Sequence, residues 1–186
     1  MMSRIQPHFL YNTLSSIQAL CRIDPEKAFD VTEKFGTYLR SNIDSLDRPD
    51  LIPFANELEH TRVYSEIEMI RFPNVRVDYD VTDAAFSVPA LTMQPLVENA
   101  IRHCVRIRKE GVVAVSSRKT DLCHEIVISD NGKGFDTRLL KTAGGTHIGV
   151  RNVRERIEKM CGGTLTVESI PDKGTTVTIR IPINGL

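Results

Sequence analysis

Two segments about thirty residues apart carry the side chains best suited to chemistry. The first runs from Leu96 to His103 and reads LVENAIRH, which places an amide, a carboxylate and basic groups on one expected helix. The second runs from Asp130 to Phe135, reads DNGKGF, and follows a short apolar run. Amide oxygens suit a magnesium ion bound to phosphates, and a carboxylate at a strand end suits a purine edge. The two segments together predict a nucleotide site.

Asn99 is the expected magnesium ligand, because the ion keeps waters and takes few protein ligands beside phosphates. Glu98 precedes it and could bind the ion through a water. Arg102 and His103 lie three and four residues further on, so we expect them on the same helix face, within reach of phosphate oxygens. Taken alone, the segment fits a solvated helix surface equally well.

Asp130 ends an apolar strand, where an unpaired carboxylate is costly to bury. The amino group of adenine is a suitable partner, whereas guanine would present an acceptor there. Gly132 and Gly134 allow close backbone approach and unusual dihedral angles. A plain Asp-Asn-Gly turn is the alternative, and the position between the asparagine helix and a second glycine cluster argues against it.

That second cluster, Gly144 to Gly149, reads GGTHIG and precedes an expected helix. Free backbone amides at a helix start bind phosphate, and the glycines would let the segment close over a nucleotide. The nucleotide contacts expected here are Gly145, Thr146, His147, Ile148 and Gly149. Arg151, Arg154 and Arg156 follow and, taken singly, fit an ordinary charged helix surface.

His8 lies in a segment near the start of the chain that reads QPHFLYN. An imidazole near neutral pH is a competent nucleophile once deprotonated, so His8 could accept a phosphoryl group. Asn12 lies one helical turn further on and could orient His8 or a hydrolytic water. Isolated histidines are more often structural.

The periodicity of apolar residues predicts the elements that must position these groups. Helices are expected over 4–22, 25–46, from Pro53 onward, 90–107 and 148–161, and strands over 75–81, 112–117, 125–129, 165–169 and 176–183. Residues 47–52 are expected to form a linker and 132–147 a mobile loop. This order predicts an α/β sandwich, a mixed sheet with helices on one face. The first two helices bury little surface as a hairpin, so we expect them to dimerise into a four-helix bundle.

Composition excludes some classes of protein. The 24 lysine and arginine residues equal the 24 aspartate and glutamate residues, which argues against nucleic-acid binding. No apolar run approaches the roughly 20 residues of a membrane span, and we expect no signal peptide. The four cysteines are widely spaced, which indicates reduced structural thiols. We therefore expect a soluble, intracellular chain.

Taken in this order, the segments resemble the LytS/YehU-like sensor histidine kinases. The resemblance covers nearly the whole chain and rests on QPHFLYN, on Tyr64 to Phe72 ending in IRF, on QPLVENAI from Gln94, and on Gly174-Thr175. It implies an α+β chain, with a dimerising phosphotransfer hairpin over 1–48 and a Bergerat-type ATP-binding domain of the GHKL class over 49–186.

The resemblance also implies a role for each group. Asn99 would hold Mg²⁺, Asp130 would bind the adenine of ATP, and Gly132, Gly134 and Gly149 would shape the pocket and its lid. Phe135 and Thr175 complete the expected nucleotide contacts. His8 would take the γ-phosphate and pass it to an aspartate of a response regulator, of the LytTR type in this family.

The family usually carries a membrane-embedded sensor upstream, and the abrupt start at Met1-Met2-Ser3 fits a chain cut from such a protein. We therefore expect the cytoplasmic part of a homodimeric protein of the bacterial cell membrane, with a dimer weakened by the cut.

Three positions depart from common patterns. His147 stands where the lid usually has a glycine, and Cys104 stands where a glycine usually follows the histidine of the asparagine segment. Phe9 follows His8, where many histidine kinases have an acidic residue that acts as base. The general base for His8 is therefore unassigned.

Two other classes of protein remain as alternatives. A gyrase- or chaperone-type ATPase, or an anti-sigma kinase, would share the adenine carboxylate and the glycines. Such ATPases place a glutamate base four residues before the asparagine, where this chain has Pro95, and an anti-sigma kinase would not need His8. A non-catalytic dimerisation module that binds nucleotide as a switch is the second alternative.

Overall fold

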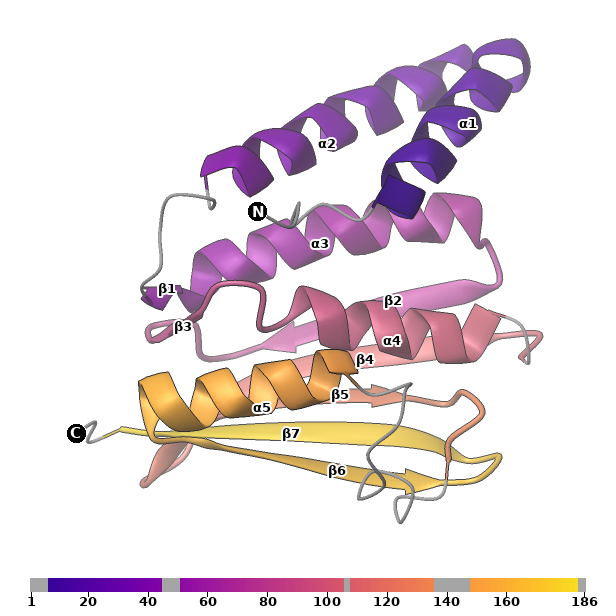
Figure 1. Cartoon of the computed structure of the whole chain (residues 1–186). Helices are drawn as coiled ribbons and strands as arrows, with labels where there is room; N and C mark the ends of the chain where they lie inside the picture. Colours follow the sequence, from indigo (N-terminus) through magenta and orange to yellow (C-terminus); the bar gives the residue numbers. More distant parts are fainter. Residues whose placement is uncertain (1–6, 45–50, 106–107, 136–147, 184–186) are drawn as a thin grey trace.

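The computed structural model of the chain describes residues 7–44, 51–105, 108–135 and 148–183 (Figure 1). Its elements, in order, are α1 (Pro7–Ile23), α2 (Pro25–Asp44), β1 (Leu51–Pro53), α3 (Phe54–Arg71), β2 (Val75–Val81), β3 (Ser87–Pro89), α4 (Gln94–Val105), β4 (Gly111–Lys119), β5 (Cys123–Asp130), α5 (Ile148–Cys161), β6 (Thr164–Ile170) and β7 (Gly174–Pro182).

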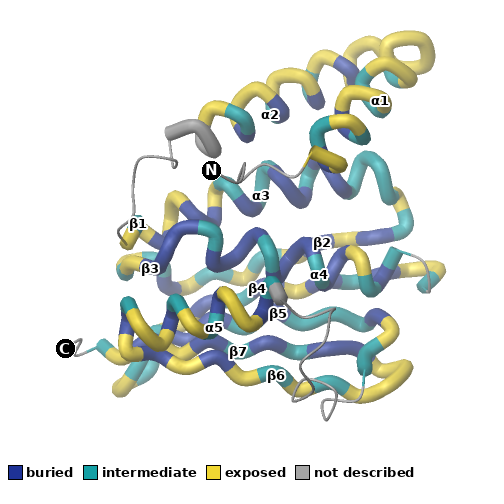
Figure 2. Tube along the Cα trace, viewed as in Figure 1, coloured by how far each residue is buried: buried dark blue, intermediate teal, exposed yellow. Residues whose placement is uncertain are grey.

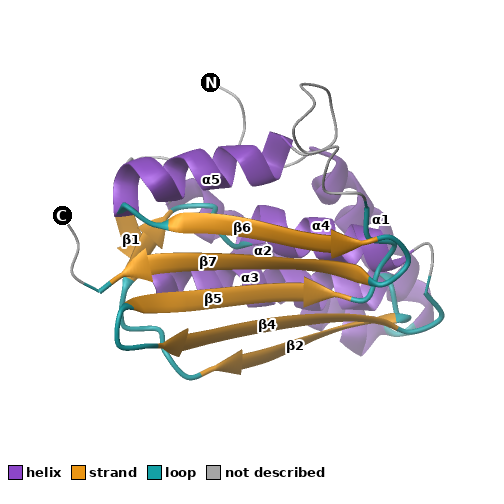
Figure 3. Ribbon diagram, turned by 90° about the horizontal axis from the view of Figure 1, so that it is seen from below, coloured by secondary structure: helices purple, strands orange, loops and turns teal. Residues whose placement is uncertain are grey.

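The main sheet has five strands in the order β2-β4-β5-β7-β6. Strands β2 and β4 are parallel and every other neighbouring pair is antiparallel. Helices α3, α4 and α5 lie along one face of this sheet (Figures 1 and 3). The expected mixed sheet with helices on one face is confirmed.

Buried and more exposed residues alternate along the strands, which explains why the helices cover one face of the sheet. In β4, Val113, Val115 and Ser117 are buried while the residues between them are more exposed, and in β5 the same holds for Ile126 and Ile128. Successive side chains of a strand point to opposite faces, so these residues meet the helices. Figure 2 shows the buried residues concentrated between the sheet and the helices.

Two of the differences between the expected and the observed boundaries have a clear physical reason. Part of the expected linker, Leu51 and Ile52, belongs to β1, which pairs with β3 in a small antiparallel sheet. Strands of three residues are too short to show alternation, so the sequence does not reveal them. The helix expected over 90–107 begins only at Gln94, because Leu91 has a φ of 58° and no helix passes through that conformation.

The hairpin of α1 and α2 packs against α3 of the same chain. The ring centroid of Phe9 lies 4.9 Å from that of Tyr38 and 4.9 Å from that of Tyr64, and all three residues are buried. Gln94 at the start of α4 donates a hydrogen bond of 2.7 Å from Nε2 to the hydroxyl of Tyr38. The hairpin thus finds an apolar partner within its own chain, and its dimerisation remains a prediction.

Replacement of Phe9 by alanine should therefore loosen the hairpin. Because Phe9 is 4 % exposed and sits among three aromatic rings, we expect Phe9→Ala to lower the free energy of unfolding by about 3–5 kcal/mol. Tyr11, two residues away, is 73 % exposed, so Tyr11→Ala should change it by less than about 0.5 kcal/mol. Urea unfolding of monomeric samples measures both, and equal losses would contradict the docking of the hairpin.

Candidate active site

Helix α4 presents different faces to two cavities, because successive helical residues are rotated by about 100°. Asn99 and His103 line the first cavity together with the end of β5. Glu98 and Arg102 line the second, together with the start of α1. The four residues expected to bind nucleotide from this helix are therefore divided between two neighbouring spaces.

Asp130 ends β5 beside α4, and its side chain is only 4 % exposed. Its Oδ1 accepts a hydrogen bond of 2.8 Å from the backbone nitrogen of Gly132. Its Oδ2 lies 3.7 Å from Nδ1 of His103, which is too far for a hydrogen bond. That Nδ1 is buried and has no hydrogen-bond partner among the described residues. A polar ligand group could satisfy both atoms.

The first cavity combines these polar groups with an apolar lining. Its apolar residues come from α4, β5, α5, β6 and β7: Leu96, Ala100, Ile128, Val150, Val167 and Val177. Phe135 and Thr175 also line it, as expected for nucleotide contacts. The cavity measures about 30 Å³, which is room for about two water molecules. A purine therefore enters only if the lining side chains move apart.

The glycines around Asp130 allow neighbouring segments of the chain to pack closely against the end of β5. A Cβ on Gly132 would lie 2.7 Å from the Cβ of His103, and one on Gly134 would lie 2.0 Å from the carbonyl oxygen of Ile170. Gly134 also has a φ of 58°, which side chains disfavour. The two glycines therefore hold the end of β5 against α4 and against the turn between β6 and β7, and so fix Asp130.

Ser169 and Arg108 support the same region, and neither was expected from the sequence. The hydroxyl of Ser169 accepts a hydrogen bond of 2.9 Å from the backbone nitrogen of Phe135 and lies 2.9 Å from the hydroxyl of Thr175. Arg108 donates from Nε to the carbonyl oxygen of Asn131 at 2.7 Å. A lone serine and a lone arginine give no signal in a single sequence.

The expected lid lies mostly outside the described residues, which include none of Gly145, Thr146 and His147. Helix α5 begins at Ile148, as expected. A Cβ on Gly149 would lie 3.7 Å from Nδ2 of Asn99, so the first turn of α5 lies next to that amide. Further along α5, Arg156 donates to the carbonyl oxygen of Leu91 at 2.7 Å, which is a structural contact.

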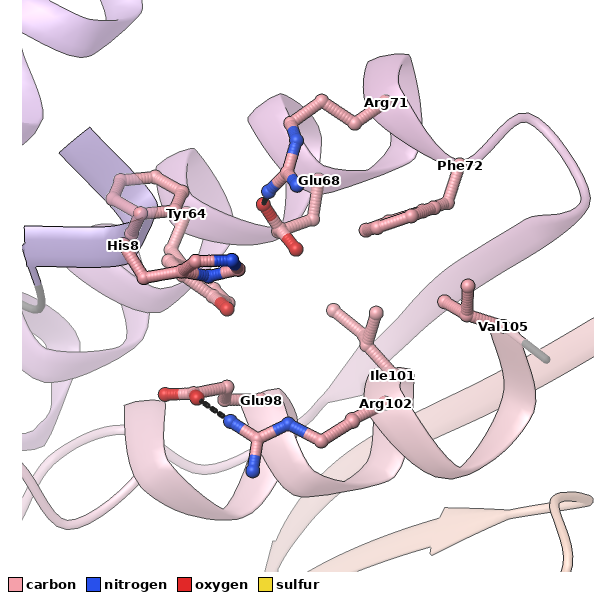
Figure 4. A pocket seen from close by; sticks show the side chains of 10 residues that line it. His8, Tyr64, Glu68, Arg71, Phe72, Glu98, Ile101, Arg102 and Val105 are labelled. Atoms are coloured by element: carbon pink, nitrogen blue, oxygen red, sulfur yellow. Dashed lines mark hydrogen bonds and ion pairs between the residues drawn. The ribbon is translucent and has the colours of Figure 1, made fainter. Parts of the chain in front are cut away.

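The second cavity measures about 370 Å³ and contains His8 (Figure 4). Nδ2 of Asn12 lies 2.9 Å from Nδ1 and 3.1 Å from Nε2 of His8, so Asn12 is placed to orient the ring. Glu98 and Arg102 form an ion pair on the α4 side of this cavity. The sequence expectation placed that pair with the nucleotide, whereas the structure places it with His8.

The stretch from Tyr64 to Phe72 supplies another wall of the second cavity. Tyr64, Glu68, Arg71 and Phe72 recur at the spacing of one helix face, and all line the cavity. Glu68 and Arg71 form an ion pair. Burial raises the pKa of the Glu68 carboxyl, against the opposing effect of Arg71. The sequence marked this stretch by resemblance but assigned it no role.

Glu57 of α3 sets the position of α4, and no pattern in the sequence indicates this role. Its carboxylate is 2 % exposed and accepts hydrogen bonds from the backbone nitrogens of Leu91, at 3.0 Å, and Met93, at 2.9 Å. Amides before and within the first turn of a helix have no partner in the helix itself, so a carboxylate there is stabilised. Burial nevertheless raises the pKa of Glu57.

Sequence comparison agrees with this geometry. The family described as "Histidine kinase" matches residues 1–76, and the family described as "Histidine kinase-, DNA gyrase B-, and HSP90-like ATPase" matches residues 89–185, which is more than half of the chain. The chain belongs to the histidine kinase family. The LytS/YehU-like resemblance is confirmed as well, since several of the relatives are LytS sensor proteins.

Two relatives and one solved structure illustrate the similarity of this histidine kinase chain. The YwpD protein of Bacillus subtilis is 37 % identical over 96 % of the chain and 67 % of its own length. The sensor protein LytS of Oceanobacillus iheyensis is 33 % identical over 97 % of the chain but 33 % of its own length. The histidine kinase ThkA, solved in complex with the response regulator protein TrrA, aligns with a TM-score of 0.56 at 17 % identity, over 94 % of this chain and 59 % of ThkA.

The chain thus spans about one third of the length of the LytS proteins that it matches. Among the described residues of this histidine kinase, no helix is long and apolar enough to cross a membrane.

Two glycines with the same backbone conformation allow the cost of backbone strain to be measured apart from the cost of a steric clash. Gly134 and Gly162 have φ values of 58° and 59°, but nothing lies within 4 Å of a Cβ built on Gly162. Gly162→Ala should cost about 1 kcal/mol of stability from strain alone, and Gly134→Ala about 2–4 kcal/mol because Ile170 must also move. Thermal unfolding measures both losses. Nucleotide binding should weaken only in Gly134→Ala, and equal effects would contradict the role given to Gly134.

Proposed function

We propose that the chain is the kinase core of a two-component sensor. It binds ATP with Mg²⁺, phosphorylates itself on His8, and passes the phosphoryl group to an aspartate of a response regulator. One observation carries the proposal: a single helix, α4, borders both the cavity that contains Asp130 and the cavity that contains His8. A phosphoryl donor and its acceptor would thus lie on two sides of one rigid element.

Asp130 and His103 support the assignment of ATP as the donor. The Oδ2 of Asp130 can accept a hydrogen bond from the amino group of adenine, and the unsatisfied Nδ1 of His103 lies close by. The apolar side chains that line this cavity suit the faces of a planar base. Guanine would direct an oxygen at a carboxylate, which disfavours it.

Asn99 is the residue that would hold Mg²⁺. Among the described residues no group of three or more histidine, cysteine, aspartate or glutamate side chains could hold a metal ion. A single amide oxygen fits an ion that takes most of its ligands from phosphates and water. When bound, the ion would neutralise charge on the phosphates. The start of α5 beside Asn99 would present backbone amides to the same phosphates.

The proposed reaction is in-line displacement on the γ-phosphorus. A ring nitrogen of His8 forms the new bond while the bond to the bridging oxygen breaks and ADP leaves. Asn12 orients the ring, and Arg102 lies where it can stabilise charge near the acceptor. Positioning and charge stabilisation supply most of the acceleration in phosphoryl transfer.

The wider organisation belongs to the same proposal. The hairpin over residues 1–48 would carry the acceptor and the dimer interface, and residues 49–186 would bind ATP. Tyr11, Leu14 and Phe29 are exposed on the hairpin and suit burial against a second copy of the chain. The complex of ThkA supports a response regulator as the partner, and LytTR-type regulators are the class we propose. The membrane would be reached through an upstream sensor region.

Labelled phosphate transfer tests the proposal directly. After incubation with γ-labelled ATP and magnesium, the chain should carry label that acid removes and alkali spares, and His8→Ala should carry none. His8 is exposed, so the variant should bind ATP as the parent does. ATP binding without label in either protein would favour a nucleotide-binding module, and label that survives the substitution would remove His8 from its role.

Adenine recognition has its own test in Asp130→Asn. The amide keeps an oxygen for the backbone nitrogen of Gly132 but loses a charged acceptor worth about 1.5–3 kcal/mol, so ATP affinity should fall roughly 10- to 150-fold. Asp78→Asn, on the exposed edge strand β2, should leave affinity unchanged. Titration with a fluorescent ATP analogue measures both, and an unchanged affinity in Asp130→Asn would contradict the assignment.

A further inference from the structure

Phosphorylation of a neutral imidazole leaves the ring with one proton too many. One nitrogen attacks phosphorus, so the other nitrogen, which carries hydrogen, becomes positively charged and must release its proton. Phe9 follows His8 and cannot accept a proton. Asn12 is an amide and is no base at neutral pH. A protein group that accepts this proton would have to come from another element.

Glu68 of α3 faces His8 across the second cavity. Both residues line this cavity, and Figure 4 shows the imidazole and the carboxylate turned toward one another. His8 and Glu68 are also close enough for His8 to lower the pKa of the Glu68 carboxyl. Glu68 is 6 % exposed, so its carboxylate lies at the closed side of the cavity, while His8 lies at the exposed side.

We propose that Glu68 accepts the proton that the His8 ring releases during phosphorylation. The inference rests on the proposed role of His8 as phosphoryl acceptor. As the bond from the attacking nitrogen to phosphorus forms and ADP leaves, the proton on the other ring nitrogen moves to the Glu68 carboxylate. The products are ADP, a phosphohistidine whose ring is uncharged and whose phosphoryl group keeps its negative charge, and a neutral carboxyl group, which later releases its proton to solvent.

The surroundings of Glu68 suit this task. Burial raises the pKa of its carboxyl, and a carboxylate with a raised pKa is a stronger base. The titratable and charged groups that share the cavity are His8 from α1, Tyr64 and Arg71 from α3, and Glu98 and Arg102 from α4. Arg71 lowers the pKa of Glu68 and Glu98 raises it. The ion pair with Arg71 favours the ionised form of Glu68, which is the form that can accept a proton.

The experiment compares Glu68→Gln with the parent chain in single-turnover labelling at saturating ATP. Glutamine keeps a hydrogen-bond acceptor for Arg71 but cannot take a proton. The rate of His8 labelling should fall about 100-fold or more, while ATP affinity and the unfolding midpoint stay as in the parent. Without its acceptor, the residual rate should rise with pH over the range in which the parent rate is constant.

Two further variants provide the controls. Glu59→Gln lies on the exposed side of the same helix and should label as the parent does. Glu68→Ala should be slow and should recover when formate is added, because the cavity is large enough for a small carboxylate. A merely structural role for Glu68 would be seen as lowered stability without recovery by formate.

The outcomes separate the inference from the proposed function. If the parent labels on His8 and Glu68→Gln labels at the same rate with the same pH profile, Glu68 is not the proton acceptor. The same conclusion follows if Glu98→Gln, and not Glu68→Gln, changes the pH profile. If the parent binds ATP but never labels on His8, the proposed function fails, and the inference fails with it.

Discussion

The hydrogen bonds from the start of α4 to the Glu57 carboxylate are the constraint on which both cavities depend. Leu91 and Met93 direct their backbone amides at this buried group, so α4 can begin only at this point and with this rotation. A shift of one residue would turn the helix by about 100° and exchange the places of Glu98 and Asn99. Burial raises the pKa of Glu57, and the hydrogen bonds from the backbone of Met93 and Leu91 oppose that shift.

The sequence predicted elements whose signal is local and periodic. The strands near 75–81, 112–117, 125–129, 165–169 and 176–183 alternate because one face of the sheet is covered, and all five are present. The asparagine segment and Asp130 were found because their residue types are unusual for a helix and a strand end. Periodicity also placed the helices to within a few residues, apart from the turn at Leu91.

The parts that escaped prediction depend on contacts between distant segments. Glu57 bonds to residues 34 and 36 positions away, and Glu68 meets His8 only after the hairpin has folded back on α3. Glu98 and Asn99 are neighbours in sequence, so their separation into two cavities follows from the rotation of α4 against its surroundings. Residue type and spacing carry no information on such rotation. For the same reason, Ser169 and Arg108 remained unnoticed.

Phe9 shows why an acceptor for the His8 proton would come from α3 rather than from the next residue. Position 9 is buried among Phe35, Tyr38 and Tyr64, so an acidic side chain there would lose its hydration without gaining a partner. An apolar residue at this position docks the hairpin and brings His8 to the cavity wall, one residue earlier on the helix. Docking and proton acceptance therefore need different residues. The stretch from Tyr64 to Phe72 can serve both needs. Tyr64 packs against the ring of Phe9, and Glu68, one helical turn later, faces the imidazole.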